Sequence, residues 1–221
     1  PYEVRPIADA LVARGLRARG PWMAGHEAGH ATLARTPHAE WIALAERELE
    51  RLRAEHARVF LVGVSMGGLV SLRLAQTRAV EGLVVVGTPL SLGPLIPPLA
   101  RLLRPLLPYR MKRGSDIRDP GARARHPGLD AMPLAAVTEL VALQGRVVGD
   151  LERVTAPILV THGRLDRTAR PADAQRILAG VSSEDRALVY LERSGHVATV
   201  DYDGPELTRR AVDFVDRLCR E

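Results

Sequence analysis

Three residue types that together can activate a serine occur in this chain in similar local settings. Ser65, Asp166 and His196 each follow a continuous apolar run, which is typical of a strand that is buried on both faces. The C-terminal ends of parallel strands share one edge of a sheet, so we expect these three side chains to meet there. His162, four residues before Asp166, falls within its strand and is interpreted as a satisfied core or edge histidine.

This combination fits nucleophilic catalysis. A serine hydroxyl is a weak nucleophile until a base takes its proton, and an imidazole with a pKa of about 6.5 can take that proton and later give it to a leaving group. A carboxylate fixes the tautomer of the imidazole and stabilises its charged form. We therefore predict Ser65 as nucleophile, His196 as general base and acid, and Asp166 as the residue that orients His196. Taken singly, Asp166 could be a turn residue and His196 a helix-entry cap; Asp173 and Asp185 are other carboxylates, but neither closes a strand.

The serine is part of a Gly-x-Ser-x-Gly turn. An apolar strand pattern leads into this turn and a leucine pattern of helical spacing follows it, which is the context that a nucleophile elbow needs. We expect Gly63 and Gly67, which have no Cβ, to let the chain pass close to itself while Ser65 takes a strained conformation. The N–H of Met66 would then lie at a helix N-terminus, where it could stabilise an oxyanion. The alternative is a glycine-rich turn with an idle serine.

Strands alternate with helices along the chain, which predicts an α/β fold with a mainly parallel sheet. The order serine, aspartate, histidine is the one expected of an α/β-hydrolase. The predicted strands cover about 16–22, 59–64, 82–87, 157–163 and 187–192, and the predicted helices about 4–14, 36–56, 69–75, 134–150, 171–179 and 205–219.

A segment rich in proline and leucine, residues 89–133, divides this pattern. It predicts short helices and no strand, inserted between two parts of one core, residues 1–88 and 134–221. Its leucines could form an apolar roof over a cleft, which makes it a candidate cap; it could equally be a separate packing unit without a substrate role. The leucines that would form this apolar roof are Leu95, Leu99, Leu102, Leu103 and Leu106.

Composition limits the function classes. The 221 residues suffice for one domain with a full core, and no apolar run approaches the roughly 20 residues that span a bilayer, so we expect no stable membrane insertion. The net charge of +5 comes almost entirely from arginines interleaved with acids, and aromatics make up only 4%, so nucleic-acid binding is not expected. With Cys219 as its single cysteine the chain has no internal disulfide, which favours the cytoplasm.

The sequence His26-Glu27-Ala28-Gly29-His30 contains the letters of a zinc-binding His-Glu-x-x-His motif. That motif works only on a continuous helix, where both imidazoles face the same way. Pro21, Gly25 and Gly29 predict a loop instead. We expect no metal here, although a zinc metallopeptidase using His26, Glu27 and His30 remains an alternative.

The chain resembles the small bacterial carboxylesterases and monoacylglycerol lipases of the α/β-hydrolase superfamily. The residues that carry the resemblance, which runs from about Tyr2 to Leu218, are Gly25-His26, Trp41, Gly63 to Gly68, Asp166 and Ser194 to Asp201. It implies hydrolysis of short- to medium-chain carboxylic esters, or of monoacylglycerols, without a cofactor or metal, with Met66 giving one oxyanion N–H and 89–133 forming the cap. It also implies that the Gly25-His26 loop is a structural turn. A monomer is favoured.

The resemblance also implies a leading strand. The family pattern begins with a strand ending in a His-Gly motif, whose next residue gives the second oxyanion N–H, and this chain starts at Pro1, just after the place of that motif. Without that strand, which would lie between 16–22 and 59–64, backbone groups would stay unpaired at a cost of several kcal/mol. We therefore expect a further N-terminal segment of roughly 25–30 residues, with the second donor upstream of Pro1. A catalytically impaired binding protein of the same fold is the other alternative.

Overall fold

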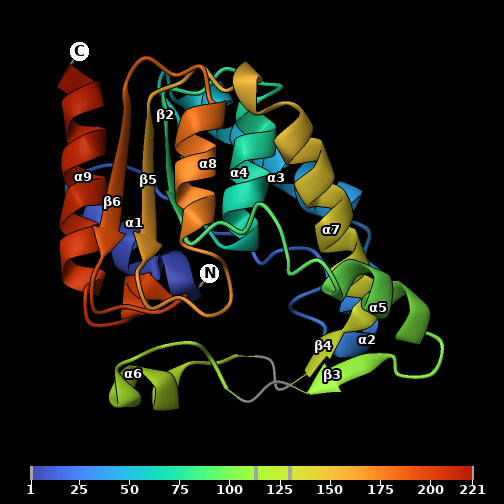
Figure 1. The fold of residues 1–221 in the computed structure, drawn as a ribbon. Helices are drawn as coiled ribbons and strands as arrows, with labels where there is room; N and C mark the ends of the chain where they lie inside the picture. Colours follow the sequence, from blue (N-terminus) through green and yellow to red (C-terminus); the bar gives the residue numbers. More distant parts are fainter. Residues whose placement is uncertain (1, 112–113, 129–130, 221) are drawn as a thin grey trace.

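Four parallel strands form the centre of the molecule. The structure, a computed structural model, describes residues 2–111, 114–128 and 131–220. Its main sheet has the order β1-β2-β5-β6, and Figure 1 shows its strands side by side with helices on both faces. The strands are β1 (Phe60–Val64), β2 (Gly82–Val86), β5 (Ile158–Gly163) and β6 (Arg186–Leu191). All residues of β2 and β5 are buried, as continuous apolar runs predict for strands covered on both faces.

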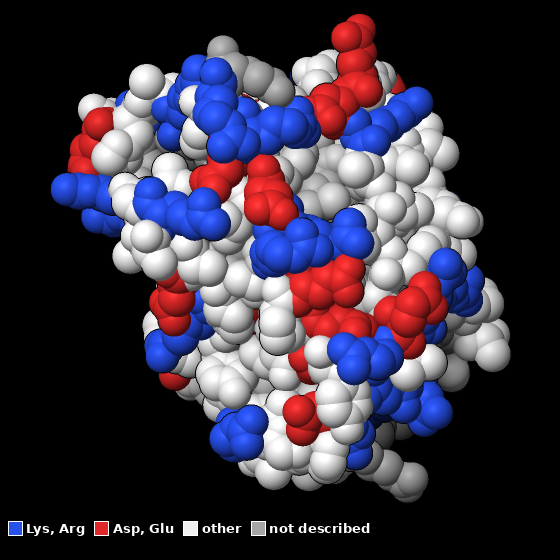
Figure 2. All heavy atoms as spheres, turned by 90° about the vertical axis from the view of Figure 1, so that its left-hand side faces the viewer, with Lys and Arg blue, Asp and Glu red and all other residues white. Residues whose placement is uncertain are grey.

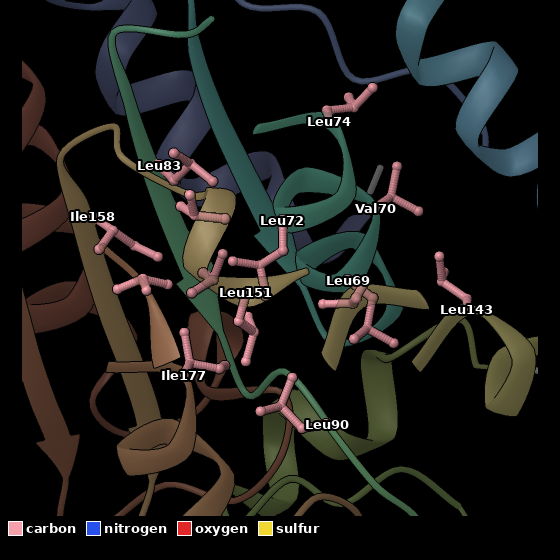
Figure 3. Packing of buried hydrophobic residues seen from close by; sticks show 14 of the residues in the cluster. Leu69, Val70, Leu72, Leu74, Leu83, Leu90, Leu143, Leu151, Ile158 and Ile177 are labelled. Carbon is pink, nitrogen blue, oxygen red and sulfur yellow. The ribbon is translucent and has the colours of Figure 1, made fainter. Parts of the chain in front are cut away.

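The helices form two layers around this sheet. On one face α1 (Arg5–Val12) packs against α9 (Gly204–Arg220), whose buried positions include the predicted Leu207 and Phe214. On the other face lie α3 (His38–Glu55), α4 (Met66–Ala75), α7 (Leu134–Gly149) and α8 (Ala172–Gly180). The larger core cluster joins α4 to β2 and β5 through such residues as Leu72, Leu83 and Ile158, and Figure 3 shows their side chains turned toward one another. Burial of this apolar surface is what holds α4, and so the serine turn before it, against the sheet.

The inserted segment 89–133 leaves the core after β2. Its described elements are α5 (Ile96–Leu103), β3 (Tyr109–Met111), α6 (Pro120–Arg125) and β4 (Ala131–Pro133); residues 112–113 and 129–130 of the segment lie outside the described residues. The expectation that no strand interrupts it is wrong, because β3 and β4 pair antiparallel. Each of these strands has only three residues, too few for a period to show in the sequence. Figure 1 shows the segment on the side toward which the strand arrows point.

Residues 16–22 do not form the predicted strand. They run as irregular chain, and Trp22 is 58% exposed. Two arginines of this stretch pair with α3, since Arg17 contacts Glu55 at 3.3 Å and Arg19 contacts Glu48 at 3.0 Å. The remaining short elements are α2 (His30–Leu33) and the 3-10 turns η1 (Tyr2–Val4), η2 (Leu151–Arg153) and η3 (Ala198–Val200).

Charges of both signs alternate on the face that carries α9, as Figure 2 shows. Arg14 of the α1 end pairs with Asp216 of α9 at 2.8 Å, and Arg217 of α9 pairs with Asp185 at 2.6 Å. Exposed pairs of this kind add little to stability. In the described ranges, every helix is too short or too polar to cross a membrane.

Candidate active site

Ser65, His196 and Asp166 lie in one hydrogen-bonded row. The Ser65 Oγ is 2.8 Å from His196 Nε2, and His196 Nδ1 is 2.8 Å from Asp166 Oδ2. The three residues come from the ends of β1, β6 and β5, which share one edge of the sheet. In the tautomer that suits these partners, Nδ1–H donates to the carboxylate and Nε2 accepts from the serine hydroxyl. The structure thus brings together the three side chains singled out in the sequence.

Ser65 lies on a strained turn between β1 and α4. Its φ of 53° and ψ of −118° make it the one non-glycine residue with positive φ in the described part of the chain. A Cβ on Gly63 would lie 2.3 Å from the carbonyl oxygen of Gly67, so the turn closes against β1 only because Gly63 has none. The prediction of a strand, a tight turn and a helix holds, and it leaves the Ser65 side chain at the C-terminal edge of the sheet.

The second glycine of the pentapeptide has a different neighbour from the one expected. A Cβ on Gly67 would meet nothing within 4 Å, so the expectation that Gly67 permits a close approach is wrong. The crowded position is Gly68, where a Cβ would lie 1.9 Å from Oγ1 of buried Thr88. The chain therefore needs a small residue one position later, where α4 packs on the segment that follows β2.

Asp166 is the most enclosed of the three side chains. Its Oδ1 accepts the backbone N–H groups of Thr168 and Ala169, each at 2.8 Å, which leaves Oδ2 for His196. Burial alone raises the pKa of Asp166, but contacts from His162 and His196, the charge of His196 and the N–H of Ala169 together hold that pKa well below its usual range. The carboxylate is therefore ionised at neutral pH and fixed in orientation.

The loop that carries His196 is held by backbone contacts. A Cβ on Gly163 would lie 2.2 Å from the carbonyl oxygen of Gly195, so the loop lies directly on the end of β5. Below it, Asp201 accepts four backbone N–H groups at 2.8 to 2.9 Å, those of Gly195, Arg118, Asp119 and Tyr202. One carboxylate thus ties the His196 loop to the inserted segment. The sequence analysis did not single out this role, because a lone aspartate after a loop has no pattern of its own.

Other candidates have separate roles. Asp173 is buried and accepts the N–H groups of Leu90 and Ser91 at 2.9 and 3.2 Å, which fixes the chain after β2, and Asp185 pairs with Arg217. Neither carboxylate joins the row. Met66 begins α4, so its N–H is among those that an α-helix leaves without an internal acceptor.

A comparison with protein families decides the relationship. A family model described as serine aminopeptidase, S33 (Hydrolase_4), matches residues 39–203, about three quarters of the chain, and this span contains Ser65, Asp166 and His196. The chain belongs to this α/β-hydrolase family.

Relatives within the family support the same grouping. A thermostable monoacylglycerol lipase of Bacillus sp. (strain H-257) is 29% identical over 218 residues, which cover 97% of this chain and 85% of the relative. A carboxylesterase of Bacillus subtilis (strain 168) is 23% identical over 217 residues, 98% of this chain and 87% of the relative. A solved structure from work on the metagenome-derived lipolytic enzymes LipS and LipT superposes with a TM-score of 0.92 at 24% identity, over 97% of this chain and 88% of that one. The predicted fold and the kinship with ester hydrolases are therefore confirmed.

The His-Glu-x-x-His residues do not lie on one helix, as the sequence predicts. Residues 24–28 are turns and bends, and only His30 begins a helix, the four-residue α2. The His26 ring packs edge-on against the Trp41 ring, and the His30 ring packs edge-on against the Tyr109 ring. In both pairs the ring centroids are 6.2 Å apart. Over the described residues, no three metal-ligating side chains are grouped to hold an ion. The zinc alternative lacks the helix that would aim both imidazoles at one metal.

Two hollows of the surface lie away from the hydrogen-bonded row. One of about 710 Å³ lies between α1, η3 and α9, lined among others by Ala10, Val200 and Val212. Another of about 370 Å³ lies beside Arg118 and Tyr202. Ser65 lines neither of them, so the candidate site is defined by the hydrogen-bonded row and not by these two hollows.

Proposed function

We propose that this chain is a serine carboxylesterase that hydrolyses carboxylic esters of short to medium acyl length, or monoacylglycerols, through an acyl-enzyme. The observation that carries the proposal is the pair of 2.8 Å contacts that joins Ser65 to His196 and His196 to Asp166. Nucleophile, base and orienting acid are within hydrogen-bond reach, which is the geometric requirement for this chemistry. The names of the curated relatives, a monoacylglycerol lipase and a carboxylesterase, support esters as the substrate class.

Acylation begins at Ser65. Its Oγ attacks the ester carbonyl while the hydroxyl proton moves to Nε2 of His196. The imidazolium so formed donates through Nδ1 to Asp166, whose ionised and buried carboxylate stabilises the positive charge. His196 then gives the proton to the departing alcohol oxygen, which leaves the acyl group on Ser65.

Deacylation repeats the sequence with water. His196 takes a proton from water, the hydroxide attacks the acyl carbonyl, and the proton returns to Ser65 Oγ as the acid leaves. In both steps negative charge develops on the carbonyl oxygen, and the N–H of Met66 at the start of α4 is the donor proposed for it.

We also propose that residues 89–133 act as a cap over the acyl chain. The segment lies beyond the C-terminal ends of the strands, and Asp201 ties it to the His196 loop. Its helix α5 packs on α7 but exposes Leu99 to 47% and Leu103 to 38%, so apolar surface is available on it. Such a surface suits an acyl chain better than a charged substrate.

The test is a comparison of substrate classes on one preparation. We expect hydrolysis of p-nitrophenyl butyrate and monobutyrin, and little of an aminoacyl p-nitroanilide, the substrate type that the family description suggests. Ser65→Ala should abolish turnover, whereas Ser182→Ala, which removes an exposed hydroxyl far from the row, should not. Preference for the anilide would assign peptidase chemistry instead. No turnover and no reaction with a fluorophosphonate would favour the binding-protein alternative.

A further inference from the structure

A second histidine touches the carboxylate of Asp166. His162 lies on β5, one residue before the strand ends, and its exposed fraction is 0%. Its Nε2 is 2.9 Å from Asp166 Oδ2, the same oxygen that His196 Nδ1 approaches to 2.8 Å. The Asp166 side chain is itself fully buried. Two imidazoles therefore share one carboxylate oxygen in a site closed to solvent.

The polar surroundings of His162 are sparse. Among the described residues, no hydrogen bond is assigned to either ring nitrogen, yet Nε2 lies 2.9 Å from Asp166 Oδ2, which is within hydrogen-bond distance. Burying a polar group without a well-placed partner is unfavourable. The interpretation of His162 as a satisfied histidine is therefore right about burial and wrong about satisfaction. A group kept at such a cost calls for a role.

The surrounding sheet gives His162 little freedom. β5 is an inner strand, paired to β2 on one side and to β6 on the other, and His162 is in register with Tyr190. Across the site, a Cβ on Gly87 would lie 3.0 Å from the carbonyl oxygen of His196, so the loop that carries His196 lies close against the end of β2. The position of His162 relative to Oδ2 is thus set by a strand that is paired on both sides.

We infer that His162 is a positioning residue for the Ser65–His196–Asp166 row, in which its neutral imidazole holds Asp166 Oδ2 together with His196. The inference rests on the proposed function. Backbone N–H groups hold Oδ1, and the two imidazoles hold Oδ2, so the carboxylate cannot rotate away from His196.

Sharing Oδ2 also changes how strongly Asp166 holds the charged His196. A neutral N–H donor draws on the negative charge of Oδ2, so the imidazolium of His196 is stabilised less than it would be by an unshared carboxylate. His162 must stay neutral for this, because two cations against one buried carboxylate would leave an uncompensated charge.

The other charged groups near the His196 loop are already engaged. Asp116 of the inserted segment lies against Gly195 and accepts the backbone N–H of Arg167 at 2.7 Å, and Asp201 accepts that of Gly195. Arg118 lies 3.7 Å from Asp116. These contacts do not involve His162, so a change at His162 leaves them in place.

The first test needs no variant. Nitrogen-15 NMR of the imidazoles in the wild-type protein reports which ring nitrogen carries the proton. We expect His162 to be neutral with its proton on Nε2 throughout the pH range in which His196 titrates. A proton on Nδ1, or a charged His162 in that range, would overturn the inference, and this result does not depend on enzymatic activity.

The second test compares His162→Leu, which has no donor, with His162→Gln, which can place an amide N–H near the position of Nε2. By NMR we expect the titration midpoint of His196 to move to higher pH by at least about 0.5 unit in the leucine variant and to return toward the wild-type value in the glutamine variant. In the pH profile of kcat/KM for p-nitrophenyl butyrate, the acid limb should likewise move to higher pH in the leucine variant and return in the glutamine variant. In the leucine variant kcat should fall while KM changes little.

A folded leucine variant with an unchanged His196 midpoint would refute the inference. If the leucine variant does not fold, the tautomer of His162 in the wild type decides. Failure of the proposed function has a different signature, because then the wild type itself would not hydrolyse the ester while the NMR titrations could still show His162 controlling His196.

Discussion

Two adjacent glycines in α4 should respond in opposite ways to the same substitution. In Gly68→Ala the new Cβ would lie 1.9 Å from Thr88 Oγ1 and 3.0 Å from Thr88 Cβ. Rotating Thr88 moves Oγ1 but not Cβ, so the backbone must shift, and overpacking of this kind costs about 1–3 kcal/mol. In Gly67→Ala the Cβ meets nothing within 4 Å, and alanine in place of a helical glycine gains up to about 1 kcal/mol.

The same helix gain applies to both variants and cancels, so their free energies of unfolding should differ by the overpacking cost of about 1–3 kcal/mol. Urea unfolding followed by tryptophan fluorescence measures this, because Trp41 is buried in the core with 1% exposure. An unchanged slope m would show that the comparison is one of stability. Adding Thr88→Ala to Gly68→Ala should recover at least half of the loss. Equal stability of the two glycine variants would refute the packing argument.

Three more predictions follow from the site. Asp201→Asn turns two of its backbone contacts into donor–donor contacts, so we expect a loss of about 1–3 kcal/mol in urea unfolding and a lower kcat; full stability would contradict the role of Asp201 as a tie. The folded-state pKa of Asp166 is lowered, so its ionised form adds stability above the unfolded pKa of about 3.9, and that stability is lost as the pH falls below it. The difference in free energy of unfolding between wild type and Asp166→Asn should thus become smaller as the pH falls from 5 to 3. A difference that grows over this range would contradict the lowered pKa of Asp166. Replacing Leu99 and Leu103 by glutamine should change unfolding by no more than about 0.5 kcal/mol, because both are exposed, yet lower kcat/KM for p-nitrophenyl octanoate more than for the acetate; an equal effect on both esters would argue against the cap.

The sequence was sufficient for the elements that a strong pattern marks. Continuous apolar runs located β1, β2, β5 and β6, and the residues that close three of them are the ones that meet in the row. This works because the strands of such a sheet carry few polar residues, so a serine, aspartate or histidine after one of them stands out, although only β2 and β5 are buried along their whole length.

Errors occurred where patterns are short or misleading. The stretch 16–22 has apolar residues at intervals, but its arginines reach to α3 and no neighbouring strand pairs with it among the described residues. The strands β3 and β4 have three residues each and depend on a partner some twenty residues away, which no local period reveals.

Contacts between residues far apart in the chain could not be predicted from the sequence either. Gly68 needs its small size only because Thr88 follows the neighbouring strand, and Asp201 is a tie only because the inserted segment returns to it. His162 is separated from Asp166 by one short turn, yet its meaning depends on both residues facing the same buried space. The spacing of four residues was visible, but the direction of the side chain was not.

The most direct test of the central claim is intact-mass analysis after treatment with phenylmethylsulfonyl fluoride, followed by peptide mapping. The account predicts one adduct per chain, located on Ser65, absent in Ser65→Ala and strongly slowed in His196→Ala, since the hydroxyl then has no base 2.8 Å away. Ser182→Ala should be labelled like the wild type. A folded protein without an adduct, or with an adduct on another residue, would contradict the assignment of Ser65 as nucleophile.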